Sequence, residues 1–211
     1  MRKKSTLAAL CLFSALALII SCNQPAADNT TSVGGSDTSM AADVKYGGYN
    51  SQVKWGEHLV IIGGCNDCHT PKKMGANGPE NDMSLMLSGH PAKQPPPKYD
   101  PKEAAKNGLI VTQTFTAWTG PWGTTYAANL TSDSTGIGMW TEAQFVKSLK
   151  EKKWMGLENT RPLMPPMSMM PATEMTEEEL KAIFAYLKTT PAINNVQPAA
   201  ELLPPPGAGT Q

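Results

Sequence analysis

The clearest pattern in the chain is a helical repeat of apolar side chains near its C-terminal end. A Thr-x-x-Glu capping box at residues 176–179 precedes the repeat, and Lys188 and then Pro191 follow it. These signals predict an amphipathic helix that ends before the proline. Its apolar face consists of Leu180, Ile183, Phe184 and Leu187.

Shorter signals predict further helices. A capping box at residues 141–144 precedes apolar residues at helical spacing in 145–149. Apolar residues in 53–62 predict a helix that leads into a Gly-Gly pair. An Asp-Pro-x-Glu start at residues 100–103 predicts a short helix that ends at Gly108.

The middle of the chain is dominated by glycine, proline and β-branched residues. The glycines and prolines of residues 70–99 predict a loop with a short helical turn at 83–87. Residues 109–118 are β-branched and aromatic, which predicts an extended segment or a small hairpin, followed by a turn at 120–123.

The two ends of the chain differ in composition from the middle. Residues 1–22 combine a basic start with an apolar run, which predicts an export signal too short to span a membrane comfortably. The run ends in Ile-Ile-Ser-Cys, which resembles a lipobox, so Cys22 is predicted to be lipidated; an ordinary signal peptide with an incidental cysteine is the alternative. Residues 23–44 predict a flexible tether and the Pro-rich residues 196–211 a disordered tail, which leaves 45–195 as one domain.

The charge of the mature chain argues against a nucleic-acid partner. The full chain carries 18 basic and 18 acidic residues. Loss of Arg2, Lys3 and Lys4 with the export signal leaves 18 − 3 = 15 basic residues against 18 acidic ones. Proteins that bind nucleic acid through its backbone carry a basic patch or stripe, and this composition predicts none.

The cysteines divide between two tasks. Cys11 lies in the apolar run that is discarded, and Cys22 is the predicted lipid acceptor. Only Cys65 and Cys68 are left, so no pair remains for a disulfide framework.

The sequence Cys-Asn-Asp-Cys-His at residues 65–69 has the spacing of a c-type haem attachment site. Two thiols add to the two vinyl groups of one porphyrin, so they need to lie about one helical turn apart on one face. The next residue, His69, is then placed to bind the iron as the proximal ligand. The motif therefore predicts one haem c, attached to Cys65 and Cys68.

Other uses of this motif are less well supported. A structural zinc ion needs four ligands, and beyond the motif the mature chain offers only His58 and His90. A thioredoxin-like dithiol needs a βαβ context, whereas the flanks predict helix and loop. A disulfide across two intervening residues is sterically poor. We interpret His58 as a surface or satisfied histidine and His90 as a solvated loop histidine; an alternative sixth ligand or a propionate partner is the other role open to His90.

Four segments together resemble bacterial class I cytochromes c, in the branch that includes the cytochrome c subunits of periplasmic alcohol, aldehyde and gluconate dehydrogenases. They occur in family order within about residues 53–195. Those dehydrogenase subunits carry three haem motifs and this chain has one, so the resemblance implies a single-haem carrier or subunit. The segments are residues 55–71, 129–145, 161–167 and 175–188.

The resemblance implies a mostly α fold in which helices surround one haem and the first and last helices pack across each other. The distal iron ligand is expected from a non-helical loop, and the prolines of residues 161–172 block helix there. Met167 follows Pro165-Pro166 and matches the family's Pro-Pro-Met position, so it is the predicted distal ligand. The competing methionines of this loop are Met164, Met169 and Met170.

These observations predict an electron carrier, not an enzyme, on the periplasmic side of a bacterial membrane. Its partners are expected to be redox proteins, with a dehydrogenase or respiratory complex as one of them. A haem-based sensor or gas-binding module is one alternative, and a dedicated electron-transfer subunit of a dehydrogenase complex is another. Rapid carbon monoxide binding by the ferrous form favours the sensor, and co-purification with a large partner favours the subunit.

Replacing Cys22 by serine should release the protein from the membrane fraction, because several acyl chains on that residue are the predicted anchor. Membrane fractionation and intact-mass measurement of wild type and Cys22→Ser test this. Cys11→Ser, in the same segment, is the control that should stay on the membrane. A soluble wild-type protein with an unmodified mature N-terminus contradicts the prediction.

Overall fold

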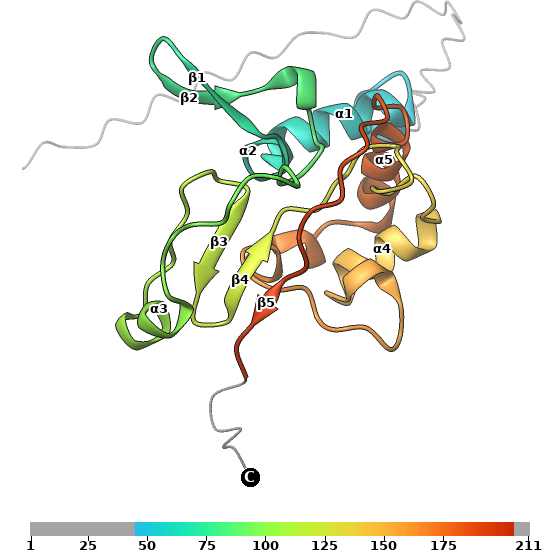
Figure 1. Ribbon diagram of the computed structural model, residues 1–211. Coiled ribbons are helices and arrows are strands. Elements are labelled where there is room, and N and C mark those ends of the chain that lie inside the picture. Colours follow the sequence, from blue (N-terminus) through green and yellow to red (C-terminus); the bar gives the residue numbers. More distant parts are fainter. Residues whose placement is uncertain (1–44, 205–211) are drawn as a thin grey trace, which may run out of the picture. The chain divides into compact units, whose positions relative to one another are not determined.

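The computed structural model describes residues 45–204, so the predicted export signal, Cys22 and the predicted tether lie outside the described residues. The helices are α1 (Gln52–Ile62), α2 (Cys65–His69), α3 (Pro101–Asn107), α4 (Glu142–Lys150) and α5 (Glu177–Leu187) (Figure 1). The strands are β1 (Lys72–Gly75), β2 (Gly78–Asn81), β3 (Ala117–Gly120), β4 (Gly123–Tyr126) and β5 (Glu201–Leu202). Short 3-10 segments are Lys45–Gly48, Met83–Leu85, Trp154–Gly156, Met167–Met169 and Pro171–Thr173.

The predicted helix caps are formed. The hydroxyl of Thr176 accepts a hydrogen bond from the Glu179 N–H (3.2 Å), and the Glu179 carboxylate accepts one from the Thr176 N–H (2.7 Å). Thr141 and Gln144 make the same pair of contacts at the start of α4. Each box satisfies N–H groups that the first turn of a helix leaves without an intrahelical partner.

The apolar core lies where α1 and α5 pack together (Figure 1). Phe145 of α4 joins it, with its ring 5.4 Å from the ring of Phe184 on α5. The packing of the first and last helices that the resemblance implied is therefore confirmed. The buried core residues of these helices are Leu59, Val60, Phe145, Leu180, Ala182, Ile183, Phe184 and Leu187.

Gly56 sets how closely the two helices approach. A Cβ atom on Gly56 would lie 1.8 Å from the carbonyl oxygen of Ala182 and 3.0 Å from the Cβ of Tyr186. Any larger residue would force α1 away from α5. Glycine in the middle of a helix is unfavourable because it loses more conformational entropy on folding than other residues. Here the close approach of the two helices requires it.

A three-stranded antiparallel sheet, with the order β3-β4-β5, lies beside the helices (Figure 1). Residues 109–118 were expected to include an extended segment or hairpin, and the hairpin forms slightly later, as β3 and β4 around the predicted turn. Val111 adds only an isolated bridge to Thr119. A second small sheet is present as well, so the structure supports the predicted mostly α class only loosely.

The second sheet is the hairpin of β1 and β2, in a region predicted to be loop. Its four residue pairs run from Lys72↔Asn81 to Gly75↔Gly78. The loop prediction was wrong here because the density of glycine and proline hid the ladder. Main-chain pairing holds a short hairpin even where the side chains have low strand propensity.

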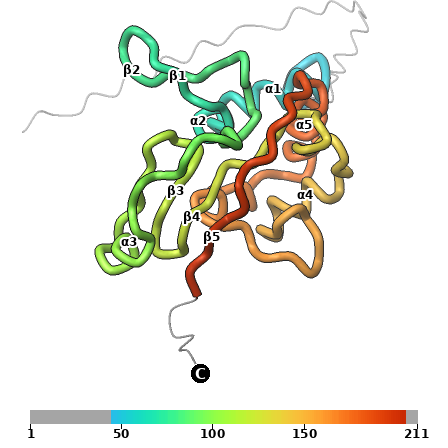
Figure 2. The backbone as a smooth tube through the Cα atoms, viewed as in Figure 1, coloured from blue at the N-terminus to red at the C-terminus, as the bar shows by residue number. Residues whose placement is uncertain are grey.

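The chain after α5 turns back across the molecule, and β5 pairs with β4 there (Figure 2). Glu201 pairs with Thr124 and Leu202 with Gly123, and the Leu203 N–H donates to the carbonyl of Trp122 at 2.9 Å. The prediction of a disordered tail is therefore wrong for residues 201–203, because the sheet edge supplies backbone partners that composition does not reveal. Residues 205–211 lie outside the described part.

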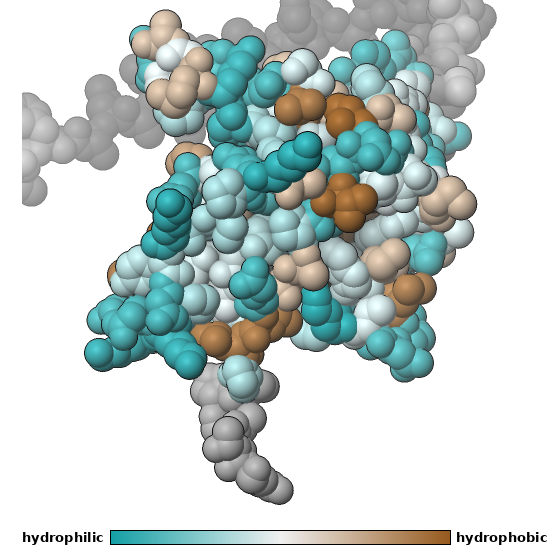
Figure 3. Space-filling model, viewed as in Figure 1, coloured by the Kyte–Doolittle hydropathy of each residue, from teal (hydrophilic) through white to brown (hydrophobic). Residues whose placement is uncertain are grey.

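The visible surface is mixed in character. Figure 3 shows small apolar groups set among hydrophilic residues on one face. Within residues 45–204, none of the helices has both the length and the apolar character to cross a bilayer.

Replacing Gly56 by alanine should destabilise the protein by about 1–3 kcal/mol, the usual cost of overpacking a core. Alanine favours helix over glycine by only about 1 kcal/mol, which does not offset a Cβ placed 1.8 Å from the Ala182 oxygen. Thermal unfolding measures the difference. Lys54→Ala, on the exposed side of the same helix, should leave the unfolding midpoint almost unchanged, and equal midpoints for Gly56→Ala and wild type would show that the helices separate without cost.

Candidate functional site

A pair of glycines separates α1 from the helix that carries the Cys-x-x-Cys-His motif. The Gly63 N–H donates to the Leu59 carbonyl at 2.8 Å and closes α1. Gly64 then adopts a left-handed conformation with φ 64°, which glycine reaches without steric penalty. The chain changes direction there, and α2 begins at Cys65.

The two thiols of α2 are three residues apart, on one turn of the helix. Cys65 and Cys68 are both partly buried and form no disulfide with each other. Burial raises the pKa of the Cys65 thiol to about 11 and also raises that of Cys68, so both groups are protonated at neutral pH. Cys65 packs against the apolar core cluster, which anchors this turn to the rest of the fold.

His69, at the end of α2, is buried, with 7% of its surface exposed. Its Nδ1 lies 2.8 Å from the carbonyl oxygen of Ala128, fifty-nine residues later in the chain. A carbonyl only accepts, so Nδ1 carries the proton and Nε2 presents a lone pair. Burial lowers the pKa of His69, which keeps the ring neutral. Among the contacts of residues 45–204, none provides a hydrogen bond to Nε2.

These three side chains do not surround one point in space. Across the described range, no three side chains of His, Cys, Asp or Glu are grouped so that they could hold a metal ion together. The motif therefore presents one oriented imidazole and two separate thiols. That donor set fits a group with two attachment points at its edge and an iron atom that takes one histidine.

A comparison with family profiles matches residues 53–191 to the family described as Cytochrome c. The chain belongs to the cytochrome c family. A comparison with curated proteins finds no match. Membership gives the chain the cytochrome c fold and haem-based electron transfer as its general function.

Haem c is the group that this family binds covalently. In this cytochrome, Cys65 and Cys68 have free thiols that would attach the haem, and His69, hydrogen-bonded to the Ala128 carbonyl, would bind its iron. Such a hydrogen bond to the second nitrogen of a histidine ligand fixes the ring and raises its basicity. The residues present thus fit the group, and their individual roles stay predictions.

Residues 125–128 link His69, the predicted proximal ligand, to the loop of the predicted distal ligand. The Thr125 hydroxyl of β4 donates to the Pro165 carbonyl at 2.7 Å. Ala128, three residues after Thr125, accepts from His69. Three extended residues span about 10 Å. The predicted distal loop is therefore hydrogen-bonded to Thr125 at one end of residues 125–128, and His69 to Ala128 at the other end.

Burial separates the four methionines of the distal loop. Met169 and Met170 are 68% and 40% exposed, whereas Met164 and Met167 are partly buried. An iron ligand faces the interior, which favours the second pair. Met167 begins a short 3-10 turn, and the Lys152 ammonium donates to the carbonyl of the next residue, Ser168, at 2.6 Å. Between Met164 and Met167 the Pro-Pro-Met resemblance still decides.

His90 corrects the interpretation of a solvated loop histidine, because its side chain is fully buried at 0% exposure. Its Nδ1 lies 2.9 Å from the Thr116 hydroxyl and its Nε2 lies 2.9 Å from the Gln94 carbonyl. Both ring nitrogens are therefore occupied by the protein. His90 is excluded as the sixth ligand and as a propionate partner in this conformation. His58 is partly buried, with its ring stacked on that of Tyr49 at a centroid distance of 5.0 Å.

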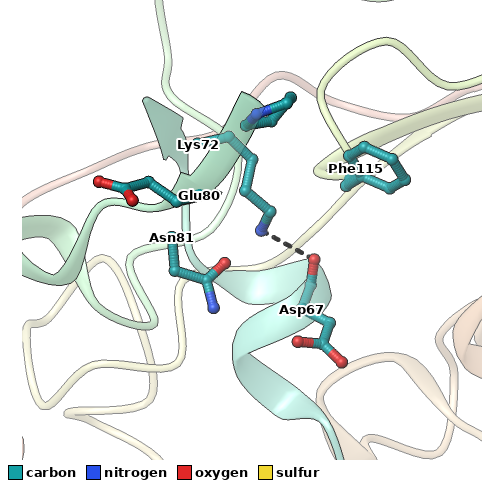
Figure 4. Close-up of a pocket in the computed structure, with 6 residues that line it drawn as sticks. Asp67, Lys72, Glu80, Asn81 and Phe115 are labelled. Atoms are coloured by element: carbon teal, nitrogen blue, oxygen red, sulfur yellow. Dashed lines mark hydrogen bonds between the residues drawn. The ribbon is translucent and has the colours of Figure 1, made fainter. Parts of the chain in front are cut away.

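Lys72 braces the end of the motif helix, a role that the sequence did not reveal. Its ammonium donates to the carbonyl of Asp67 at 2.8 Å (Figure 4). It also donates to the carbonyl of Thr70 at 2.7 Å. A cation at a helix C-terminus satisfies carbonyls that lack an intrahelical partner. Burial lowers the pKa of Lys72. The hollow of about 360 Å³ beside it is lined by Asp67, Lys72, Pro79, Glu80, Asn81 and Phe115, none of which is a predicted haem ligand.

The other contributor that sequence reasoning missed is Ala128. It acts through its backbone carbonyl, and any residue supplies that group, so no side-chain signal marks the position. Only the fold brings residue 128 to His69.

Replacing Met167 by alanine should abolish the weak sulfur-to-ferric-iron absorption band, open the haem to carbon monoxide and lower the reduction potential, because thioether ligation favours the ferrous state. Optical spectra and a redox titration measure these changes. Met169→Ala, at an exposed position two residues away, is the matched control and should leave all three unchanged. Loss of the band in Met164→Ala, with survival in Met167→Ala, contradicts the assignment.

Proposed function

We propose that this cytochrome is an exported, lipid-anchored carrier of single electrons with one haem c, attached at Cys65 and Cys68 and ligated by His69 and Met167. The observation that carries the proposal is the hydrogen bond from buried His69 to the Ala128 carbonyl. It places an oriented, neutral imidazole directly beside two thiols on one helical turn. That combination supports haem attachment better than a metal chelate or a redox dithiol.

When bound, haem supplies a one-electron couple in which iron alternates between ferrous and ferric. The residues of the chain set the conditions for that couple. His69 is held in one tautomer, and the apolar core against which Cys65 packs limits access of water. Ligation by His69 and Met167 would raise the reduction potential relative to two histidines.

The same arrangement keeps the haem-carrying turn rigid. The Thr70 hydroxyl accepts a hydrogen bond from the N–H of fully buried Leu87 at 2.9 Å. The Lys72 ammonium donates to the carbonyls of Asp67 and Thr70 in the same turn. A carrier benefits from rigidity, because little structural change then accompanies each electron transfer.

Exposed apolar side chains next to the ligand segments support contact with redox partner proteins. Ile61 and Ile62, each 64% exposed, end α1 just before the haem motif. Met169 and Met170 follow the predicted distal ligand. Apolar residues at such positions favour docking of another protein near the cofactor. We propose a dehydrogenase or respiratory complex as one partner and a second redox protein as the other, with a subunit role in a dehydrogenase complex as the related possibility.

The N-terminal sequence supports the proposed location of the protein in the cell. An apolar export segment that ends in a lipobox-like Cys22 supports placement on the periplasmic side of a bacterial membrane, with lipid as the anchor. The mildly acidic mature chain supports protein and membrane partners and not nucleic acid.

Replacing both Cys65 and Cys68 by alanine should remove covalent haem, because thioether bonds need the thiols and survive unfolding. Haem staining after denaturing electrophoresis measures attachment, and a pyridine haemochrome assay should give one haem per chain in wild type. Cys11→Ala, outside the mature chain, is the control that should keep its haem.

Wild-type haem that acid acetone extracts would overturn covalent attachment. A ferrous wild-type protein that binds carbon monoxide rapidly would overturn the carrier function and favour the sensor. These two outcomes are independent, since the first reports the thiols and the second reports the sixth ligand.

A further inference from the structure

The ring of His90 is a buried titratable group to which the proposed function assigns no role. Within residues 45–204, no acidic side chain makes an ion pair with it. Burial lowers the pKa of His90, so the ring is neutral. Nε2 then donates to the Gln94 carbonyl, and Nδ1 lies 2.9 Å from the Thr116 hydroxyl, which also contacts the Thr114 hydroxyl at 3.1 Å. The ring also packs on Tyr126 of β4, with the ring centres 5.0 Å apart.

The backbone next to this ring reaches both sides of the His69 hydrogen bond. The Gly89 N–H donates to the carbonyl of His69 at 2.8 Å. The His90 N–H donates to the carbonyl of Ala127 at 2.9 Å. Ala127 directly precedes Ala128, whose carbonyl accepts from His69 Nδ1. Residues 88–90 therefore connect the donor residue to the acceptor segment.

Gly89 lies against that acceptor segment without room for a side chain. A Cβ on Gly89 would be 2.6 Å from the Ala127 oxygen and 2.7 Å from the Ala128 oxygen. Its φ of +80° also disfavours any other residue. The acceptor carbonyl is thus held by direct backbone packing as well as by hydrogen bonds.

Asn195, in the segment that follows α5, hydrogen-bonds to the backbone of residues 88–90. Its side-chain N–H groups donate to the carbonyls of Ser88 (2.7 Å) and His90 (2.8 Å). Its side-chain oxygen accepts from the Ala92 N–H at 3.0 Å. The 88–90 segment is consequently held by two sets of hydrogen bonds, those of the His90 ring and those of the Asn195 side chain.

We propose that His90 and Asn195 are positioning residues for the proximal ligand: by anchoring residues 88–90, they hold the Ala128 carbonyl against His69 Nδ1 and so set the reduction potential. The inference rests on the proposed function, because it takes His69 as the iron ligand. A strong hydrogen bond makes the imidazole more basic and stabilises ferric iron. Release of either anchor weakens that bond and raises the potential.

Thr116→Val removes the hydroxyl that holds His90 Nδ1 while nearly preserving shape, and Asn195→Ala removes the second anchor. In each variant the equilibrium constant for haem reduction should rise about threefold, which is about 30 mV, since tenfold is 59 mV for one electron. Exchange of the His69 Nδ1 proton, followed by NMR of the reduced holoprotein, should become about tenfold faster. Thr116→Ser restores a hydroxyl and should restore both values.

Thr190→Val is the matched control. Thr190 is also a buried threonine, and its hydroxyl makes a single hydrogen bond, 2.7 Å to the Leu187 carbonyl at the end of α5. The hydrogen bonds of Thr190 within residues 45–204 go to Leu187 and Ser132, and none joins it to residues 88–90. It should lower thermal stability without changing the potential or the exchange rate. If Thr116→Val and Asn195→Ala behave like Thr190→Val, with stability lost and the potential unchanged, the anchors are purely structural and the proposal is wrong.

Hydrogen exchange in the wild-type protein tests the proposal even if the variants do not fold. The Gly89 amide and the His69 Nδ1 proton should exchange with the same protection factor, because one opening of residues 88–90 exposes both. A Gly89 amide that exchanges at least tenfold faster than His69 Nδ1 overturns the link. Absence of covalent haem in wild type is a separate result, which refutes the proposed function and is read before any potential is measured.

Discussion

The hydrogen bond between His69 Nδ1 and the Ala128 carbonyl is the interaction on which the site depends. It crosses between segments far apart in the chain and determines which ring nitrogen has a lone pair. Because the ring is buried, loss of this hydrogen bond would leave its N–H without a partner and would destabilise the folded protein. Several contacts of residues 88–90 hold the segments that carry these two groups next to each other.

Several distant parts of the chain converge to hold that bond. The α1–α5 crossing, close because of Gly56, supports the turn that carries Cys65. Strand β4 leads into Ala128 and is tied by Thr125 to the loop of the predicted distal ligand. The segment after α5 returns with Asn195 to the other side of the site. The candidate site therefore depends on α2, on the β3-β4-β5 sheet and on the segment that follows α5.

Local signals predicted the elements well where the cause is local. The Thr176 and Thr141 capping boxes act within a few residues, and both form as expected. The β1–β2 hairpin and strand β5 were missed because their stability comes from backbone pairing with partners that composition does not identify. His90 was misjudged for a related reason: a Gly-His-Pro loop is usually solvated, and here the chain folds over it.

By itself the sequence determined the family, the Cys-x-x-Cys-His spacing and the helices at both ends of the domain, because spacing along a helix translates directly into a shared face. It narrowed the distal ligand to a proline-bounded loop of methionines. Only the tertiary structure decided that both His90 nitrogens are occupied, that Met169 and Met170 face outward, and that a backbone carbonyl orients His69. Those outcomes depend on contacts between residues distant in the chain, and a carbonyl oxygen is the same in every residue.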